Sequence, residues 1–430
     1  MALLLKNARL VDPACGLDDI ADMVIRDGRV VEIGKGLSIA KGVTRDLTGK
    51  VVVPGLVDMH VHLREPGYEQ KEDIASGTRA AAHGGFTAVC AMPNTNPVTD
   101  NAAQVRYVLD RGAEVGKCRV HVAGAISKGL AGEALSEMGD MVAHGAVAFT
   151  DDGRGVQTAG MMRLAMDYAS MFDRPVMSHC QDESLVGDGQ VNEGAVSTRL
   201  GMLGWPAEGE EIQIARDIAL CRLTGCPLHI QHITTARGLG LVRAAKAEGL
   251  PVTCEVTPHH LFLTEDDIGQ DYNTSFKVNP PLRTAEDAAA LREGVKDGAI
   301  DCIATDHAPH AAWDKDCEFE VAAFGTTGLE TAVSLVLTNL VGTGAIGYGR
   351  MVELMAINPR RILRLEEVRL EAGSVADLTV IDPEIAWTVS AEGFFSKAAN
   401  SAFIGEALKG RATDVYIGGY PTMEEGVIVE

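Results

Sequence analysis

Residues 51–62 read Val51-Val52-Val53-Pro54-Gly55-Leu56-Val57-Asp58-Met59-His60-Val61-His62, an apolar stretch that ends in two histidines. It is the first of eight β-rich stretches between residues 51 and 307, and segments of helical composition separate them. The other seven are Phe86–Asn94, Arg119–Ile126, Ala146–Asp152, Pro175–His179, Pro227–Ile233, Val252–His260 and Asp301–His307. Eight alternating β and α units predict an α/β fold with a closed, TIM-like (β/α)8 barrel.

Short β-rich stretches separated by turns flank this central region on both sides. Near the start, Asp27-Gly28 is a hairpin turn between two such stretches, and Asp377–Ile381 and Asp414–Ile417 follow the barrel region. We therefore expect residues 1–54 and 366–430 to form one small β-sandwich domain. The barrel domain, residues 55–365, would interrupt it.

Composition narrows the class of protein. The chain has 430 residues and a net charge of −22, which opposes binding to nucleic acid or to anionic lipid. Its nine cysteines include no Cys-x-x-Cys pair, and no signal peptide precedes the first strand, so we expect a cytoplasmic protein with reduced thiols. The uncharged stretches 80–99 and 331–349 are too polar to span a membrane.

Polar side chains gather where the predicted strands end. In a (β/α)8 barrel these carboxyl ends together form the active site. Any one of these histidines alone is as well explained by a hydrogen-bonded core position, but their shared placement favours a functional site. The residues concerned are His60, His62, Asn94, Asp152, His179, His232, His259, His260 and Asp306.

The residue types favour a metal centre. His60 and His62 are two residues apart on one strand, so both imidazoles face the same side and can bind one ion. His179 and His232 add two nitrogen ligands, enough for a second ion if carboxylates complete the coordination. A two-metal site needs a negatively charged bridging ligand. No lysine that could be carboxylated lies between residues 128 and 246, which leaves Asp151 or Asp152 for that role.

Four sequence motifs resemble the class I dihydroorotases of the amidohydrolase superfamily. They are Asp58–Gly67, Ala91–Thr95, Phe149–Gly153 and Ala304–His310, and the small-domain segment Gly373–Leu378 is similar to many amidohydrolases. The resemblance extends over about residues 3 to 420. The segment after His310 departs from the acidic loop often found there, so the loop that covers the substrate can differ.

The resemblance implies a role for each matching residue. It implies two zinc ions per subunit, bridged by Asp152, and it makes Asp306 the catalytic acid and base. Substrate contacts would come from His62, Arg64, Asn94, Asn279, His310, Phe324 and Gly325. The metal ligands would be His60, His62, Asp152, His179, His232 and Asp306.

The implied reaction is the reversible cyclisation of N-carbamoyl-L-aspartate to L-dihydroorotate in pyrimidine (UMP) biosynthesis. In the hydrolytic direction a zinc-bound hydroxide would attack the ring carbonyl, and Asp306 would move the proton to the leaving nitrogen. The resemblance also implies a homo-oligomer, with aspartate carbamoyltransferase as a candidate partner.

Two other functions fit the same fold. One is another cyclic-amide hydrolase: a dihydropyrimidinase, hydantoinase or allantoinase. Those enzymes use the carboxylated lysine that this chain lacks, and a plain dihydropyrimidine offers no carboxylate to Arg64. The other is an inactive homologue that serves as a structural partner of aspartate carbamoyltransferase. That interpretation conflicts with the retained histidines and Asp306. An assay of ring opening with dihydroorotate and with dihydrouracil separates the three.

Overall fold

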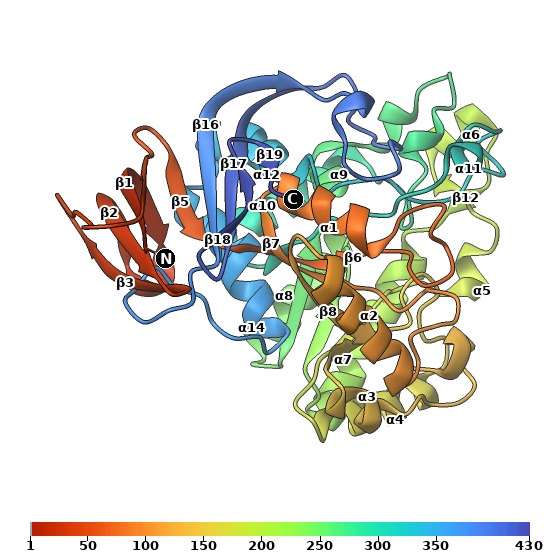
Figure 1. Ribbon diagram of the computed structural model, residues 1–430. Coiled ribbons are helices and arrows are strands. Elements are labelled where there is room, and N and C mark those ends of the chain that lie inside the picture. Colours follow the sequence, from red (N-terminus) through yellow and green to blue (C-terminus); the bar gives the residue numbers. More distant parts are fainter. Residues whose placement is uncertain (1) are drawn as a thin grey trace.

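A computed structural model describes residues 2–430 and shows an eight-stranded parallel sheet curled into a nearly closed barrel (Figure 1). The strand order is β15-β14-β13-β10-β9-β8-β7-β6. The end of β6 reaches the segment after β15, where the backbone amide of His62 donates to the carbonyl of His307 at 2.9 Å. The expected barrel is thus confirmed. Its strands are β6 (Leu56–Val61), β7 (Phe86–Ala91), β8 (Arg119–Gly124), β9 (Ala146–Phe149), β10 (Val176–Ser178), β13 (Leu228–Ile230), β14 (Val252–Val256) and β15 (Cys302–Ile303).

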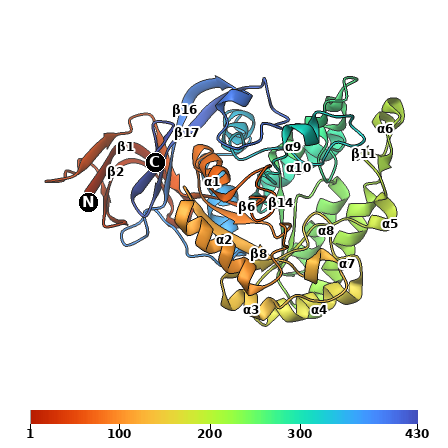
Figure 2. The same ribbon diagram turned by 45° about the vertical axis from the view of Figure 1, so that its right-hand side comes forward.

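Helices surround the barrel strands (Figure 2). Several begin at a threonine whose hydroxyl accepts a hydrogen bond from the first helical turn, as Thr158, Thr235, Thr257 and Thr284 do. The helices are α1 (Ile74–His83), α2 (Ala102–Val115), α3 (Met138–Ala143), α4 (Ala159–Ser170), α5 (Glu183–Val186), α6 (Ala195–Leu200), α7 (Glu208–Thr224), α8 (Ala236–Ala247), α9 (Pro258–Phe262), α10 (Ala285–Asp297), α11 (Ala312–Lys315), α12 (Ala332–Val336), α13 (Tyr348–Val352) and α14 (Asn358–Ile362).

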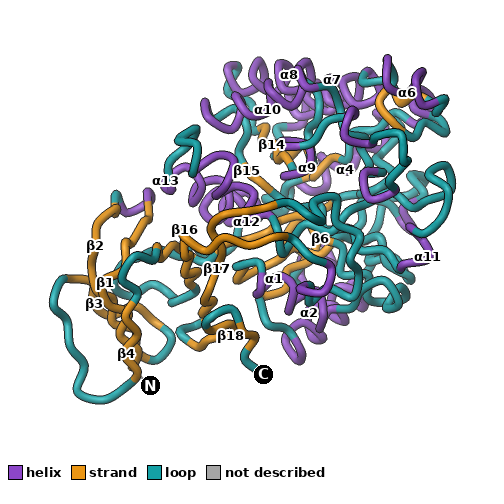
Figure 3. Tube along the Cα trace, turned by 90° about the horizontal axis from the view of Figure 1, so that it is seen from above, coloured by secondary structure: helices purple, strands orange, loops and turns teal. Residues whose placement is uncertain are grey.

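The two ends of the chain share a second, nine-stranded mixed sheet beside the barrel (Figure 3). Its order is β19-β18-β17-β16-β5-β1-β2-β3, and β4 pairs with β1. The N- and C-terminal halves meet where β5 pairs antiparallel with β16, with Val51 opposite Ile381. The strands are β1 (Ala2–Asp12), β2 (Leu17–Arg26), β3 (Arg29–Gly34), β4 (Val43–Asp46), β5 (Val51–Pro54), β16 (Leu378–Thr388), β17 (Ala407–Ile417), β18 (Tyr420–Glu424) and β19 (Val427–Ile428). A small separate sheet pairs β11 (Val191–Asn192) with β12 (Gly204–Trp205).

The stretch Val51–His62, expected as one strand, is in fact two strands in different sheets. β5 ends at Pro54 in the nine-stranded sheet, and β6 starts at Leu56 in the barrel. Gly55 sits between them, where a Cβ atom would collide with the side chain of Thr87. A continuous apolar pattern cannot show such a change of sheet, because both halves are buried.

The main hydrophobic core lies between the barrel strands and their helices. Val89 on β7 and Met162 on α4 are among its fully buried members. This packing holds the strand ends in place, and the strand ends carry the polar residues. Across residues 2–430, none of the helices combines the length and the apolar character that crossing a bilayer requires.

Candidate active site

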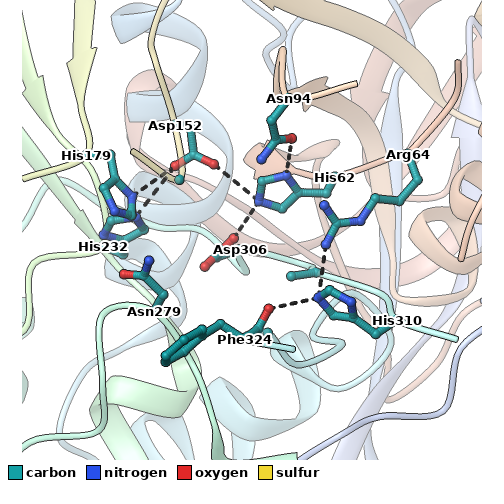
Figure 4. A pocket seen from close by; sticks show the side chains of 13 residues that line it. His62, Arg64, Asn94, Asp152, His179, His232, Asn279, Asp306, His310 and Phe324 are labelled. Atoms are coloured by element: carbon teal, nitrogen blue, oxygen red, sulfur yellow. Dashed lines mark hydrogen bonds and ion pairs between the residues drawn. The ribbon is translucent and has the colours of Figure 1, made fainter. Parts of the chain in front are cut away.

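Thirteen residues at the carboxyl end of the barrel line a cavity of about 240 Å³ (Figure 4). They come from six of the barrel strand ends and from the loops after α9 and β15. The lining residues are His62, Arg64, Asn94, Asp152, Gly153, His179, His232, Asn279, Asp306, Ala308, His310, Phe324 and Gly325. Every residue to which the resemblance gives a catalytic, metal or substrate role lies here except His60, which is fully buried beside Asp152 and Asp306.

Asp152 lies at the centre of the polar cluster. Its Oδ1 atom is 3.3 Å from His60 Nε2, 3.3 Å from His179 Nδ1 and 3.7 Å from His232 Nε2. Its Oδ2 atom is 3.4 Å from His62 Nε2. Burial raises the pKa of Asp152, but the adjacent imidazoles more than offset this and hold it well below its ordinary value. Asp152 is therefore an anionic carboxylate between two histidine pairs.

Asp306 contacts the same Nε2 atoms of the first histidine pair, His60 and His62, as Asp152 does. Its Oδ1 atom is 2.9 Å from His62 Nε2 and 3.4 Å from His60 Nε2. Burial opposes ionisation, yet the charges of His60 and His62 and a hydrogen bond with His62 lower the pKa of Asp306 below its ordinary value. Asp306 is thus an ionised carboxylate beside the first histidine pair.

These residues fit divalent metal ions. Three groups of buried ligand atoms lie within 4.8 Å of one another: His60 with His232 and Asp306, His60 with His62 and Asp152, and Asp152 with His179 and His232. The Nε2 atom of His60 is buried and has no hydrogen-bond partner among the described residues, and His179 Nδ1 lies 2.9 Å from His232 Nε2. Closely spaced imidazole nitrogens and carboxylates are typical of metal ligands. The cluster therefore supports a two-metal site.

Three residues of the site have a left-handed backbone conformation. Arg64, His232 and Asp306 have positive φ angles of 60°, 29° and 48°. Residues with side chains rarely adopt this region, and Arg and His do so at a larger cost than Asp. Residues held in this way cluster at functional sites, because the surrounding fold must stabilise them.

The cavity wall opposite the histidine cluster is basic. Arg64 and His310 meet there, with Arg64 Nη2 3.3 Å from His310 Nε2. His310 Nε2 lies 2.8 Å from the carbonyl of Phe324, and Lys71 Nζ lies 3.3 Å from His310 Nδ1. Burial, together with the charges of Arg64 and Lys71, lowers the pKa of His310 to about 2. His310 is therefore neutral, and this wall can receive an anionic group through Arg64.

Two polar residues were placed differently from the expectation. His259 and His260 were expected at a strand end, but they lie on α9, because Thr257 caps a new helix and Pro258 occupies its first turn. His260 bonds to Thr257 Oγ1 and to the carbonyl of Pro280, at 2.7 and 2.9 Å. Neither histidine is among the residues that line the cavity.

Two supporting residues lie outside the set predicted from the sequence. Glu255, in the middle of β14, lies 2.6 Å from His60 Nδ1, and its signal was a lone carboxylate inside the apolar stretch Val252–Val256. Gln181 Oε1 lies 2.9 Å from His179 Nε2 and accepts from Asn279 Nδ2 at 3.1 Å. Nothing in the sequence near Gln181 distinguishes it from a surface glutamine.

Comparison with known proteins agrees with this geometry. Residues 49–237 match the family described as "Dihydro-orotase-like". The chain is 50% identical to the dihydroorotase of Pelobacter propionicus over 420 residues, which covers 97% of this chain and 99% of the relative. It is 49% identical to the dihydroorotase of Pelotomaculum thermopropionicum, with both chains covered completely.

A solved structure shares the fold. The L-hydantoinase (dihydropyrimidinase) of Arthrobacter aurescens superposes with a TM-score of 0.90 at 27% identity, covering 100% of this chain and 97% of that one. The identity to dihydroorotases is about 50% over the full chain, against 27% to the hydantoinase, so the dihydroorotases indicate the family. The chain belongs to the dihydroorotase family of metal-dependent cyclic amidohydrolases.

Proposed function

We propose that this protein interconverts N-carbamoyl-L-aspartate and L-dihydroorotate in de novo pyrimidine biosynthesis. The observation that carries the proposal is one cavity with a metal-ligand cluster on one side and Arg64 on the other. A cyclic amide that bears a carboxylate needs both features. The first activates the amide carbonyl and water, and the second orients the carboxylate.

The metals in this proposal are two zinc ions per subunit, with Asp152 as the bridging ligand. His60, His62 and Asp306 would hold one ion, and His179 and His232 the other. When bound, the ions supply Lewis-acid polarisation of the ring carbonyl and make a nucleophile available from water near neutral pH. Nitrogen and carboxylate ligands without cysteine suit zinc, although geometry and availability also decide which metal a site holds.

Asp306 acts as the acid and base in this proposal. Asp306 is ionised, as a group that takes a proton from the attacking water must be. It then returns that proton to the ring nitrogen as the carbon–nitrogen bond breaks. In the direction of ring closure the same carboxylate removes a proton from the carbamoyl nitrogen.

The substrate carboxylate is assigned to Arg64, Asn94 and His310. Arginine can meet both carboxylate oxygens with parallel hydrogen bonds, which orients the ligand as well as binding it. Asn94 Oδ1 also lies 2.8 Å from His62 Nδ1, so the amide is held in place between the metal ligand and the cavity. Asn279 would contact the ring, and the backbone of Phe324 and Gly325 would close the far side.

We further propose that residues 1–54 with 366–430 and residues 55–365 act as two domains. The protein would work in the cytoplasm as a homo-oligomer, with aspartate carbamoyltransferase as a candidate partner. These assignments rest on the resemblance described above.

The test is hydrolysis of dihydroorotate by the purified chain, with metal counted per subunit. Turnover at about two zinc ions per subunit is expected. The likeness to an L-hydantoinase makes hydantoins and dihydrouracil the comparison substrates. Faster turnover of either one than of dihydroorotate would identify a different cyclic-amide hydrolase, and no turnover of any of them would identify an inactive homologue.

A further inference from the structure

The connection between β16 and β17, residues 389–406, extends from the terminal sheet across the barrel (Figures 1 and 3). Glu330 anchors it by accepting hydrogen bonds from the backbone amides of Phe395 and Ser396, at 2.9 and 3.3 Å. Asn400 lies further along the same connection and is buried, with 7% of the residue exposed. This connection belongs to the terminal sheet and not to the eight βα units, whose loops usually build the active site of a barrel.

The side chain of Asn400 joins the two loops that form the wall opposite the histidine cluster. Its Oδ1 atom accepts from the backbone amide of His310 at 3.1 Å. Its Nδ2 atom donates to the carbonyls of Ala308 and Gly325, at 3.2 and 3.1 Å. These partners are backbone donors and acceptors, so they leave only one orientation for the amide.

The backbone of the same residue adds two contacts. The carbonyl of Asn400 accepts from the amide of Thr327 at 3.2 Å and from the hydroxyl of Thr326 at 3.0 Å. The two loops approach each other so closely that a Cβ at Gly325 would lie 2.7 Å from Ala308 Cβ and 3.0 Å from His310 Nε2. Asn400 therefore fixes the spacing between His310 and the Phe324–Gly325 backbone, because it binds the amide of His310 and the carbonyl of Gly325.

We propose that Asn400 is a positioning residue for the substrate site, and that it holds the carboxylate-binding wall in its working geometry without touching the substrate. The proposal rests on the function proposed above, because it assigns that wall to the dihydroorotate carboxylate. It also means that a residue of the terminal β segment completes the specificity of the barrel. The side-chain partners of Asn400 are the backbone groups of Ala308, His310 and Gly325, and none of these residues is a proposed metal ligand. Asn400 therefore affects substrate capture and leaves metal binding unchanged.

The test uses two substitutions in the full-length, zinc-loaded protein. Asn400→Ala removes all three side-chain hydrogen bonds. Asn400→Asp keeps the size of the side chain but places a carboxylate oxygen against two carbonyl groups. Both should raise the KM for dihydroorotate by about tenfold or more, because small misplacements of binding groups have large kinetic effects. We expect kcat and zinc content to stay near the wild-type values.

Asn192 provides the matched control. It is a buried asparagine, 5% exposed, that also makes side-chain hydrogen bonds, to Arg283 and Glu265, but it does not line the cavity. Asn192→Ala should lower the unfolding temperature without changing the KM. A similar rise in KM for Asn192→Ala, or an unchanged KM for both Asn400 variants, would overturn the proposal.

Amide hydrogen exchange tests the link without any substrate. In both Asn400 variants the amide of His310 should exchange faster than in the wild type, whereas peptides from α7 should be unaffected. Unchanged exchange at His310 overturns the positioning role whatever the wild-type protein hydrolyses. A wild-type protein that does not turn over dihydroorotate would instead overturn the proposed function, so the two failures are distinguishable.

Discussion

The Nδ1 atom of His60 lies 2.6 Å from the Oε1 atom of Glu255, and both side chains are completely buried. The carboxylate accepts a hydrogen bond from Nδ1–H, so Nε2 is the ring nitrogen that faces Asp152 and Asp306. The same glutamate contacts His229 Nε2 at 3.1 Å. A carboxylate behind a ligating histidine both orients the ring and strengthens it as a ligand.

We therefore expect Glu255→Gln to weaken zinc binding by about 10- to 100-fold, the usual effect of losing such a partner. Competition with a chromogenic chelator measures the affinity. Glu330→Gln is the matched control, because Glu330 forms an equally short buried pair with His83, at 2.6 Å, outside the cavity. Equal zinc affinity in the wild type and in Glu255→Gln would show that the Glu255 carboxylate does not strengthen His60 as a metal ligand.

Asp306→Asn should lower the rate of dihydroorotate hydrolysis by about 10²–10⁴-fold, because an amide has the shape of the carboxylate but cannot accept the proton. Steady-state kinetics gives the rate, and circular dichroism with thermal unfolding checks that the variant folds. The assignment of Asp306 as the acid and base would be wrong if the variant kept more than about a tenth of the wild-type rate.

The two neighbouring aspartates should differ in their effect on metal content. Asp152 faces the histidines, whereas Asp151 turns away and accepts from the backbone amides of Ile126 and Ser127, at 2.8 and 3.0 Å. Asp152→Ala should lose at least one metal ion per subunit, and Asp151→Ala should keep both while losing stability. Atomic absorption on the purified variants measures this, and equal losses would rule out Asp152 as the bridge.

A carboxylate bridge also makes reconstitution independent of bicarbonate. Asp152 needs no carbon dioxide to become a ligand, unlike a lysine that must be carboxylated. Apoprotein reloaded with zinc in degassed, bicarbonate-free buffer should recover the same activity as in bicarbonate. Recovery only with bicarbonate would point to a carboxylated lysine elsewhere in the chain.

Arg64→Lys should raise the KM for dihydroorotate while zinc content stays unchanged. The Nε atom of Arg64 donates to the carbonyl of Pro309 at 3.2 Å, Nη2 lies 3.3 Å from His310 Nε2, and the residue lines the cavity. A lysine offers a single point charge in place of a planar fork. Kinetics identical to the wild type would mean that the substrate carboxylate binds elsewhere.

The barrel and most of the site residues could be predicted because each depends on local sequence. A β-rich stretch and the polar residue at its end are adjacent in the chain, as for His179 after β10 and Asp152 after β9. The fold then brings those ends together, and this general property of barrels requires no knowledge of individual contacts.

The remaining features depend on contacts between distant residues. Glu255 acts through His60, which is 195 positions away, and Asn400 acts through His310, which is 90 positions away. At the change of sheet, Gly55 lies against the side chain of Thr87, and the position of His259 depends on where a helix begins after Thr257. None of these relationships leaves a periodic pattern in the sequence.

The position of β5 has a consequence for how the protein is made. β5 lies between β1 and β16, so one neighbour is synthesised before it and the other more than three hundred residues later. On the ribosome, the edge of β5 that later pairs with β16 remains open while the whole barrel is translated, and open edges invite pairing with other nascent chains. Closure of that edge requires the same late segment that delivers Asn400. Protection from aggregation and a finished substrate pocket therefore arise together, once this segment has been translated.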